Sequence, residues 1–576
     1  MTRTLSCGPA RLVLEGDRLR HLHLDGVEAI RGLSFLVRDR DWGTVAPHIC
    51  DLRLSNGPDG SRIAWTARYD MGTGAVHAAL TVDLTPGGLT ARAVIGARGQ
   101  VWTNRTGFTL LHPITGVAGA PVTVDHADGP PEQARFPTLI APWQPFMDIT
   151  GLTHQAGGWR VACRFDGAIF EMEDQRQWGD ASFKTYNRPL ARPWPYRLEG
   201  ETSQTVTIRW SPAAPMAPVT GPEARVAHPR FPQTALALTG ADAAHLARAP
   251  QDLAAIGAQR LLCHLDAAGD VARDLAGFAA LQAALPGPAC DLELLALCDP
   301  GVDPQEEFAR HAAALAASGL AAATVLVHAR PDRQSTPPGS DWPPCAPLAQ
   351  VHAAARAAFA GLPVGGGVAG FFPELNRKPP PPGLAVVTHG LCPIVHAADD
   401  LSVVEVLEAV PHILASARAL AGDADYWLGP STIAMRHNPY GSRTIPNPGR
   451  GRVCMTDDDP RQDTKFAAAW ACGLAAAIAP PGLSVWTPAE VLGPRGLFAA
   501  DGCPRPVAGV VAALAALAGA PVHDARGGDL VRLHLGGRVL RANLTPLAQA
   551  GLAPWGWDQD DAPDLQAGAG RPTSWA

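Results

Sequence analysis

The segment from residue 260 to residue 297 decides the fold of the larger part of the chain. It contains RLLCHL at 260–265, DVARDLAGFAALQAAL at 270–285 and LELLAL at 292–297. The first and third runs have the length and apolar content of buried strands, and the middle run has apolar residues at helical spacing. Two such strands joined by a helix predict a parallel βαβ unit, because parallel strands need a crossover connection.

The same rhythm continues on both sides of this segment. Further apolar runs occur at Thr234–Leu238, Ala322–His328, Val364–Phe372, Leu384–His389, Tyr426–Leu428 and Leu483–Trp486, and helical patterns at Gln305–Ser318, Leu348–Phe359 and Leu401–Leu420. Eight strands within residues 230–520 predict a central (β/α)8 TIM barrel. The alternative, a doubly wound open sheet, would need a phosphate-binding glycine loop after an early strand, and the Thr239-Gly240 turn does not supply one.

The flanking regions predict β-structure. Residues 1–212 alternate apolar and polar positions in short runs such as Ser61–Tyr69 and Gln204–Trp210, separated by Gly, Pro and Asp, which predicts an N-terminal β-sandwich. Residues 213–229 are Pro-rich and are interpreted as a linker. Residues 521–576 contain a hairpin pattern around Gly536-Gly537, so we expect a small C-terminal β domain with a frayed tail from about Trp557.

Composition narrows the class of protein. The 576 residues carry a net charge of -7 and no basic stripe, so we expect no nucleic-acid partner. The apolar runs Phe466–Pro480 and Val507–Pro521 are short for a membrane span and predict buried helices instead. Eleven cysteines without a CxxC motif, and no secretory signal, predict a cytoplasmic protein with reduced thiols. The sequence leaves homo-oligomerisation open.

Reacting groups of barrel enzymes lie at the carboxyl ends of the strands. After the fifth strand comes FFPELNR, which places Glu374, Asn376 and Arg377 within four residues ahead of a Pro run that cannot be helical. A carboxylate, an amide and a guanidinium suit polyol recognition together with acid–base chemistry. The competing interpretation is a solvated loop with ordinary charges.

The sixth strand is followed by a second group of candidates: His389, His396 and the pair Asp399-Asp400. One aspartate can cap the helix at Leu401–Leu420, and Asp400 is the one expected to do so. His396 has no such structural role and is therefore a catalytic candidate.

The last two strand ends add Arg436 and Asn438, then Glu490 and Arg495. Glu374 and Glu490 are therefore expected to flank one substrate and to divide the roles of acid and base. The first four strand ends look poorer, and offer only Thr239, His264, Asp266, Asp299, His328 and Arg330.

One stretch of the N-terminal region departs from a plain sandwich pattern. Residues 170–186, which include Glu173 and Lys184, are dense in charged and aromatic side chains. Two interpretations remain open: a face between domains, or a loop that reaches over the barrel mouth.

Several catalytic motifs are absent from the sequence. It has no GxSxG elbow, so a serine α/β-hydrolase mechanism is unsupported, and it has neither HExxH nor a Cys/His cluster to indicate zinc. No cofactor or metal is predicted, although the carboxylates leave a divalent cation open.

Over nearly its whole length the chain resembles the D-apionate lactonase family. The matching stretches are, in order, 26–31, 37–44, 107–113, 136–137, 144–145, 170–186, Glu374–Arg377, 395–400, 459–462, Glu490 and 495–496. The resemblance implies a β domain, a barrel and a small β domain, and hydrolysis of the sugar-derived D-apionolactone in apiose catabolism.

Hydrolysis of a lactone needs an activated water, an oxyanion site and a proton for the departing ring oxygen. We expect Glu374 or Glu490 to act as the base, and the other glutamate or His396 to act as the acid. Substrate binding is expected from Asn376, Arg377, His389, Asp399, Arg436, Asn438, Arg495, Glu173 and Lys184. The alternative is a TIM-barrel glycoside hydrolase that uses Glu374 and Glu490 as its carboxylate pair.

Overall fold

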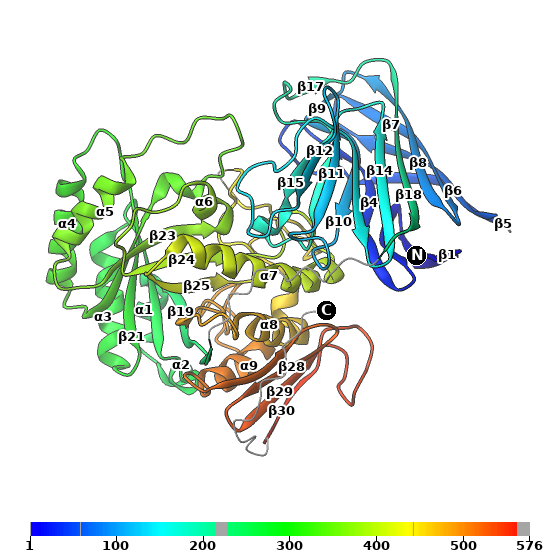
Figure 1. The fold of residues 1–576 in the computed structure, drawn as a ribbon. Helices are drawn as coiled ribbons and strands as arrows, with labels where there is room; N and C mark the ends of the chain where they lie inside the picture. The colour runs from blue at the N-terminus through cyan, green and yellow to red at the C-terminus, as the bar shows by residue number, and fades with distance from the viewer. Residues whose placement is uncertain (1, 58, 215–226, 442, 562–576) are drawn as a thin grey trace. The chain divides into compact units, whose positions relative to one another are not determined.

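A computed structural model describes residues 2–57, 59–214, 227–441 and 443–561 (Figure 1). The chain forms two compact units, one of residues 1–175 and 181–221 and the other of residues 176–180 and 222–576. We call them the N-terminal unit and the barrel unit. Most of the predicted linker, residues 215–226, lies outside the described residues, and the boundaries at 212, 230 and 520 stay predictions.

The N-terminal unit is built from two sheets, which confirms the predicted β-sandwich. The first, in the order β1-β2-β3-β4-β10-β16-β15, contains Thr2–Cys7, Ala10–Glu15, Arg18–Leu24, Val27–Arg38, Arg105–His112, Phe183–Tyr186 and Glu171–Asp174. The second, in the order β12-β11-β13-β14-β18-β8-β7-β6-β5, contains Glu132–Arg135, Pro121–His126, Ile149–Ala156, Trp159–Asp166, Glu201–Pro212, Gly88–Gly99, Gly74–Thr85, Gly60–Asp70 and Pro47–Gly57. Two short strands, β9 (Trp102–Thr103) and β17 (Tyr196–Arg197), pair with each other.

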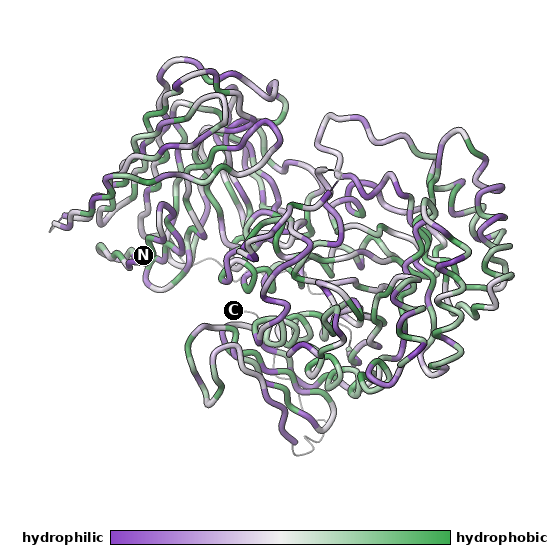
Figure 2. The backbone as a smooth tube through the Cα atoms, turned by 180° about the vertical axis from the view of Figure 1, so that it is seen from behind, coloured by the Kyte–Doolittle hydropathy of each residue, from purple (hydrophilic) through white to green (hydrophobic). Residues whose placement is uncertain are grey.

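Apolar and polar side chains alternate along these strands, so each sheet has one apolar face that can contribute to a shared core. Along β6, nearly every second side chain is buried, and the alternation of hydropathy can be followed along the strands in Figure 2. Phe35 of the first sheet lies 6.0 Å, ring to ring, from Tyr69 of the second. Apolar faces of two sheets therefore meet, as the period-two pattern requires.

The barrel unit contains a closed barrel of eight parallel strands, which confirms the central prediction. In barrel order these are β19 (Gln233–Thr239), β20 (Arg260–Asp266), β21 (Ala289–Ala296), β22 (Ala322–Ala329), β23 (Val364–Phe371), β24 (Val386–Leu391), β25 (Asp425–Ser431) and β26 (Val485–Trp486). Closure comes from the short β26, which pairs Val485 with Gln233 and Trp486 with Thr234 of β19. A buried apolar cluster that includes Ala237, Leu262 and Trp427 fills the interior.

The longer helices that connect these strands were predicted from the sequence, whereas the three shortest were not. The helices are α1 (Gly240–Leu246), α2 (Gln251–Ile256), α3 (Val271–Ala284), α4 (Pro304–Ser318), α5 (Leu348–Ala358), α6 (Phe372–Arg377), α7 (Asp400–Ala421), α8 (Lys465–Ile478) and α9 (Pro506–Ala515). The apolar run from Phe466 forms the buried helix α8, as predicted. Within the described residues, no helix is both long and apolar enough to cross a membrane.

Two predictions at helix starts need correction. Asp399, not Asp400, caps α7: its backbone is extended and its carboxylate accepts a hydrogen bond from the Ser402 N–H at 3.0 Å. Asp400 instead pairs with Arg452 at 2.8 Å, because the helix begins one residue earlier than expected. The segment after the fifth strand is also not a loop, since residues from Phe372 to Arg377 form the single turn α6 before the Pro run.

The chain continues from α9 into a four-stranded antiparallel sheet, in the order β27-β28-β29-β30. Its strands are Val522–Arg526, Leu530–Leu535, Arg538–Asn543 and Trp557–Asp561. The predicted hairpin is confirmed as β28 and β29. The expectation of fraying from Trp557 is wrong for residues 557–561, because β30 pairs along β29; residues 562–576 lie outside the described residues.

Packing of α3 against α1 generates a prediction. A Cβ on Gly277 of α3 would lie well inside van der Waals contact with the carbonyl oxygen of Gly240, whereas a Cβ on Gly287 would meet nothing within 4 Å. We expect Gly277→Ala to lower the free energy of unfolding by about 1–3 kcal/mol through overpacking. Gly287→Ala is the matched control and should leave it nearly unchanged in urea titrations; equal effects would contradict the packing argument.

Candidate active site

The first group at the barrel rim, meaning the carboxyl ends of β19–β26 and the residues that follow them, surrounds Glu374. Its side chain is only 1% exposed, and neither carboxylate oxygen has a hydrogen-bond partner among the described residues. The Arg377 guanidinium lies 4.0 Å from the carboxylate and donates to the Ser335 hydroxyl at 3.1 Å. Burial raises the pKa of Glu374 to about 7, although Arg377 and Ser335 act to lower it.

His396 belongs to the same region through a segment distant in sequence. Its Nδ1 lies 2.7 Å from a carboxylate oxygen of Asp180, which is part of the stretch Arg176–Asp180 that belongs to the barrel unit. The ring of Trp178, in the same stretch, lies 5.9 Å from the His396 ring and 5.8 Å from the Arg377 guanidinium. Trp178 therefore lies against both His396 and Arg377, the latter next to Glu374.

A second group is centred on Arg436 and Glu293. Glu293, on β21, is 2% exposed; its carboxylate accepts from Arg436 at 2.9 Å and lies 2.6 Å from Nδ1 of His264. Burial alone would raise the pKa of Glu293, but Arg436 and His264 hold it well below its usual range. Glu490 accepts from Arg495 at 2.9 Å and lies 3.8 Å from Arg436, so the two arginines and two carboxylates form one chain.

Two buried histidines lie near this second group. His437 stacks on Phe371, ring centroids 5.1 Å apart, and burial together with Arg333 and Arg436 lowers its pKa to about 3. His328, at the end of β22, also has a pKa lowered by burial. His437 Nε2 and both ring nitrogens of His328 have no hydrogen-bond partner within the described ranges. Burial disfavours the charged form of both histidines, and these ring nitrogens are placed to bond a ligand or water.

Several other residues predicted to belong to the site are hydrogen-bonded to groups of the protein itself. His389 is fully buried and bonds the Gly390 carbonyl and the Tyr426 hydroxyl, both at 2.8 Å. Asp399 caps α7, and Asn438 bonds the backbone of Arg443 and Tyr440 at 3.0 and 2.8 Å. Asn376 lies half-buried on α6 between Glu374 and Arg377.

Glu173 and Lys184 lie in the N-terminal unit, on the paired strands β15 and β16. Their side chains form an ion pair at 2.5 Å, with Lys184 buried. Burial lowers the pKa of Lys184, against the opposing effect of Glu173. The stretch 170–186 contains the strands β15 and β16 and, between them, the 3-10 turn Gln175–Trp178.

Sequence reasoning missed several members of these groups. Glu293 lies inside the apolar run that marked the third strand, and its charge there was the available signal. His264 and His328 were noted at strand ends judged to be poor, whereas the structure places His264 against Glu293. Asp180 could not be found from the sequence, because only the fold brings it to His396. No contact joins Glu374 to Glu490 among the interactions described for this unit; each belongs to its own group.

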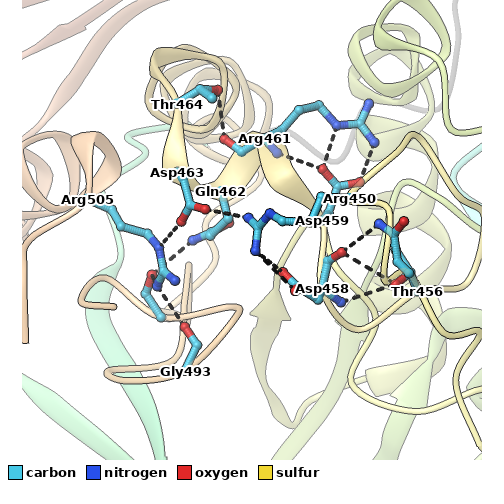
Figure 3. A network of polar contacts seen from close by, with 12 residues as sticks. Arg450, Thr456, Asp458, Asp459, Arg461, Gln462, Asp463, Thr464, Gly493 and Arg505 are labelled. Carbon is cyan, nitrogen blue, oxygen red and sulfur yellow. Dashed lines mark hydrogen bonds and ion pairs between the residues drawn. The ribbon is translucent and has the colours of Figure 1, made fainter. Parts of the chain in front are cut away.

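Figure 3 shows a network of polar contacts in the connection between β25 and α8. Arg495 of the second group donates to the Asp457 carbonyl in this connection at 3.3 Å. Arg461 and Asp459 are both fully buried and joined at 2.6 Å, and Arg450 bonds Asp458 at 3.2 Å. Arg505 bonds Asp463 at 2.6 Å and the Gly493 carbonyl at 2.7 Å, which fixes the loop that carries Arg495. Among the described residues no group of three or more His, Cys, Asp and Glu side chains is placed to hold a metal ion.

A closed parallel barrel with buried carboxylates, histidines and arginines at the ends of its strands, preceded by a β-sandwich, defines a (β/α)8-barrel enzyme. The comparisons with known proteins specify it further. The model of the D-apionate lactonase TIM barrel domain matches residues 234–519, and that of the D-apionate lactonase N-terminal domain matches residues 1–213. The chain therefore belongs to the D-apionate lactonase family.

A curated relative and more distant solved structures were also found. The D-apionate lactonase of Brucella anthropi is 42% identical over 538 residues, which cover 89% of this chain and 87% of that protein. An alpha-galactosidase from Geobacillus stearothermophilus matches at 10% identity and a TM-score of 0.25, over 94% of this chain and 90% of its own. A galactose mutarotase-like protein from Lactobacillus casei matches at 10% identity and a TM-score of 0.27, over 37% of this chain and 100% of its own.

The Glu293 group predicts a strong effect on stability. Glu293→Gln would leave Arg436 buried with only the longer contact to Glu490, so we expect a loss of about 3–5 kcal/mol in the free energy of unfolding at neutral pH. Because the pKa of Glu293 is lowered in the folded state, this contribution should disappear as the pH falls into the range where glutamate is protonated. Urea titrations at neutral and acidic pH measure both effects.

The control for this prediction is Asp83→Asn, which removes the charge of an exposed ion pair with Arg62 at 3.6 Å. It should change stability by less than about 1 kcal/mol. If the two substitutions cost the same, the Glu293 group does not carry the stability assigned to it.

Proposed function

We propose that this protein hydrolyses D-apionolactone to D-apionate, as the name of the Brucella anthropi relative indicates for that enzyme. The observation that carries the proposal is the family match over both the barrel and the N-terminal region. The substrate is then a small sugar lactone, a cyclic ester with several hydroxyl groups.

Glu374 is the best-supported group for proton transfer. A general base works best when its pKa lies near the working pH, and the pKa of Glu374 is about 7. Neither of its carboxylate oxygens has a hydrogen-bond partner in the part of the chain that the structure describes. In the proposed step, Glu374 accepts a proton from water while the water oxygen bonds to the lactone carbonyl carbon, and the carbonyl electrons move onto oxygen.

His396 is proposed to complete the reaction. When the tetrahedral intermediate collapses, the bond between the carbonyl carbon and the ring oxygen breaks, and the departing alkoxide needs a proton. His396 can donate it from the ring nitrogen that does not face Asp180, while the contact with Asp180 orients the ring. Asp180 is thus a positioning residue.

The positive groups of the rim have separate proposed roles. Arg377, next to Glu374, is proposed to stabilise the oxyanion, and Asn376 to bind a sugar hydroxyl. Arg436 and Arg495 are both held by carboxylates, so we propose that Glu490 positions these guanidinium groups instead of acting as the base. His389, Asp399 and Asn438 already have protein partners and are left out of the proposed substrate contacts.

A cytoplasmic location is also part of the proposal. All eleven cysteines are free thiols in the structure, and six of them are buried. A protein with this many free thiols is expected in a reducing compartment.

Substitution of Glu374 tests the reaction. We expect Glu374→Gln to lower kcat for D-apionolactone by about 100- to 10,000-fold, because the amide cannot accept the proton from water. Acid release in weakly buffered medium with a pH indicator measures turnover, and wild-type kcat/KM should rise as the pH passes through about 7.

The control is Glu306→Gln, an exposed position on α4, which should turn over like the wild type. Aldonolactones other than D-apionolactone and aryl glycosides are assayed in parallel. Near-normal turnover in Glu374→Gln would remove Glu374 from the mechanism, and cleavage of a glycoside with no lactone hydrolysed would refute the lactonase proposal.

The same variant predicts a pH dependence of stability. A carboxyl whose pKa is raised in the folded state contributes stability that is complete below its unfolded pKa and is lost as the pH rises through the folded value. Wild type should therefore lose on the order of 3 kcal/mol relative to Glu374→Gln between about pH 4.5 and pH 8. Thermal unfolding of both proteins across this range measures the difference; a constant difference would show that the carboxyl titrates normally.

A further inference from the structure

Arg105, on β10 of the N-terminal unit, is a buried cation that the proposed reaction does not use. Its side chain is 6% exposed, and its guanidinium lies 3.8 Å from the centre of the Tyr186 ring and 5.4 Å from that of Trp42. Its Nε has no hydrogen-bond partner in the described part of the chain. Buried charges in proteins are normally paired and fully hydrogen-bonded, so a bound anion would supply the partner that this guanidinium lacks.

The carboxylates near Arg105 have other partners in the protein. Glu171 accepts from the Tyr186 hydroxyl at 2.6 Å and from the Leu190 N–H at 2.9 Å. Glu173 is held by Lys184 at 2.5 Å. Burial raises the pKa of Glu171, against the opposing effect of Arg105.

A second guanidinium lies in the same place. Arg188 packs over the Tyr196 ring at 4.2 Å, and its Nε is likewise buried without a partner among the residues described. Tyr196 pairs with Thr103 of β9, and the Thr103 hydroxyl accepts a hydrogen bond from the Arg105 backbone N–H at 3.1 Å, so the two arginines belong to the same region of the unit. Arg105, Arg188 and Lys184 thus outnumber Glu171 and Glu173.

Two buried asparagines, each directly before one of these arginines in the sequence, have side-chain oxygens without a hydrogen-bond donor among the described residues. Asn187 is 5% exposed; its amide nitrogen donates to the Thr106 carbonyl at 3.3 Å, whereas its Oδ1 has no partner within the described ranges. Asn104 is 3% exposed and shows the same pattern, with its amide nitrogen on the Arg40 carbonyl at 3.0 Å. An anion alone would not satisfy these oxygens, whereas a ligand with hydroxyl groups would.

We propose that Arg105, Arg188, Asn187, Tyr186 and Trp42, the arginine–aromatic cluster, bind a small polyhydroxy carboxylate. The guanidinium groups match a carboxylate, the amide oxygens accept from hydroxyls, and the rings offer apolar faces to the carbon chain. Trp42 and Arg188 are half-buried, so the cluster reaches the surface. Binding of an anion stands on these contacts alone; the choice of a sugar acid rests on the proposed function, whose product carries these groups.

Calorimetric titration of the full chain with sodium D-apionate at constant ionic strength tests the proposal. Wild type should bind, and Arg105→Gln should weaken binding by at least 10-fold. Arg209→Gln, at an exposed position on β18, is the matched control and should bind like the wild type. Arg188→Gln should also weaken binding, and it serves as the second variant if circular dichroism shows that Arg105→Gln is misfolded.

The outcomes separate the alternatives. Loss of binding in Glu374→Gln with normal binding in Arg105→Gln would place the acid in the barrel and overturn the proposal, as would the absence of binding in wild type. Equal binding of inorganic phosphate or acetate would overturn the ligand class. If wild type fails to hydrolyse the lactone but D-apionate binding still depends on Arg105, the cluster stands and the proposed function fails.

Discussion

Closure of the barrel is the constraint on which the rest of the structure depends. The sheet closes through β26, a strand of only two residues, whose pairing with β19 joins the first and last strands of the barrel. Because all eight strands are parallel, closure brings eight carboxyl ends to one rim, and side chains far apart in the sequence become neighbours there. Without that closure, Glu293 of the third strand and Arg436, which follows the seventh, would have no reason to meet.

The carboxylates at this rim lie in two different electrostatic environments. Around Glu293 and Glu490, carboxylates pair with arginines and order the guanidinium groups, and the pKa of Glu293 is held well below its usual range. Around Glu374, burial outweighs the nearby arginine, and the carboxyl titrates near neutrality. A barrel whose carboxylates were all paired would be rigid but chemically inert; one with all of them unpaired would be costly to fold. The separation lets one rim contain paired carboxylates together with a carboxyl whose pKa lies near 7.

The sequence predicted the fold well because the fold depends on local patterns. The period of apolar residues located all eight barrel strands, and most helix bounds agree within a residue or two. The site was only partly accessible, since it depends on which strand ends converge. Glu374, Arg377 and His396 were found from their positions after strands, but Glu293 was hidden inside an apolar run and Asp180 lies in another region of the chain. His389 and Asp399 have partners within the protein, because a polar residue at a strand end can equally serve a neighbouring hydroxyl or a helix cap.

The stretch Arg176–Asp180 has a consequence for how this protein can be divided. It lies between strands of the sandwich in the sequence but belongs to the barrel unit, to which it supplies Trp178 and the aspartate that holds His396. Neither unit is therefore encoded by one contiguous segment of the gene. A truncated protein that begins at the barrel would lack Asp180. Replacement of the sandwich by that of another protein would also remove Asp180. Recombination can move the two modules only together, so we expect them to be inherited as a single unit of evolution.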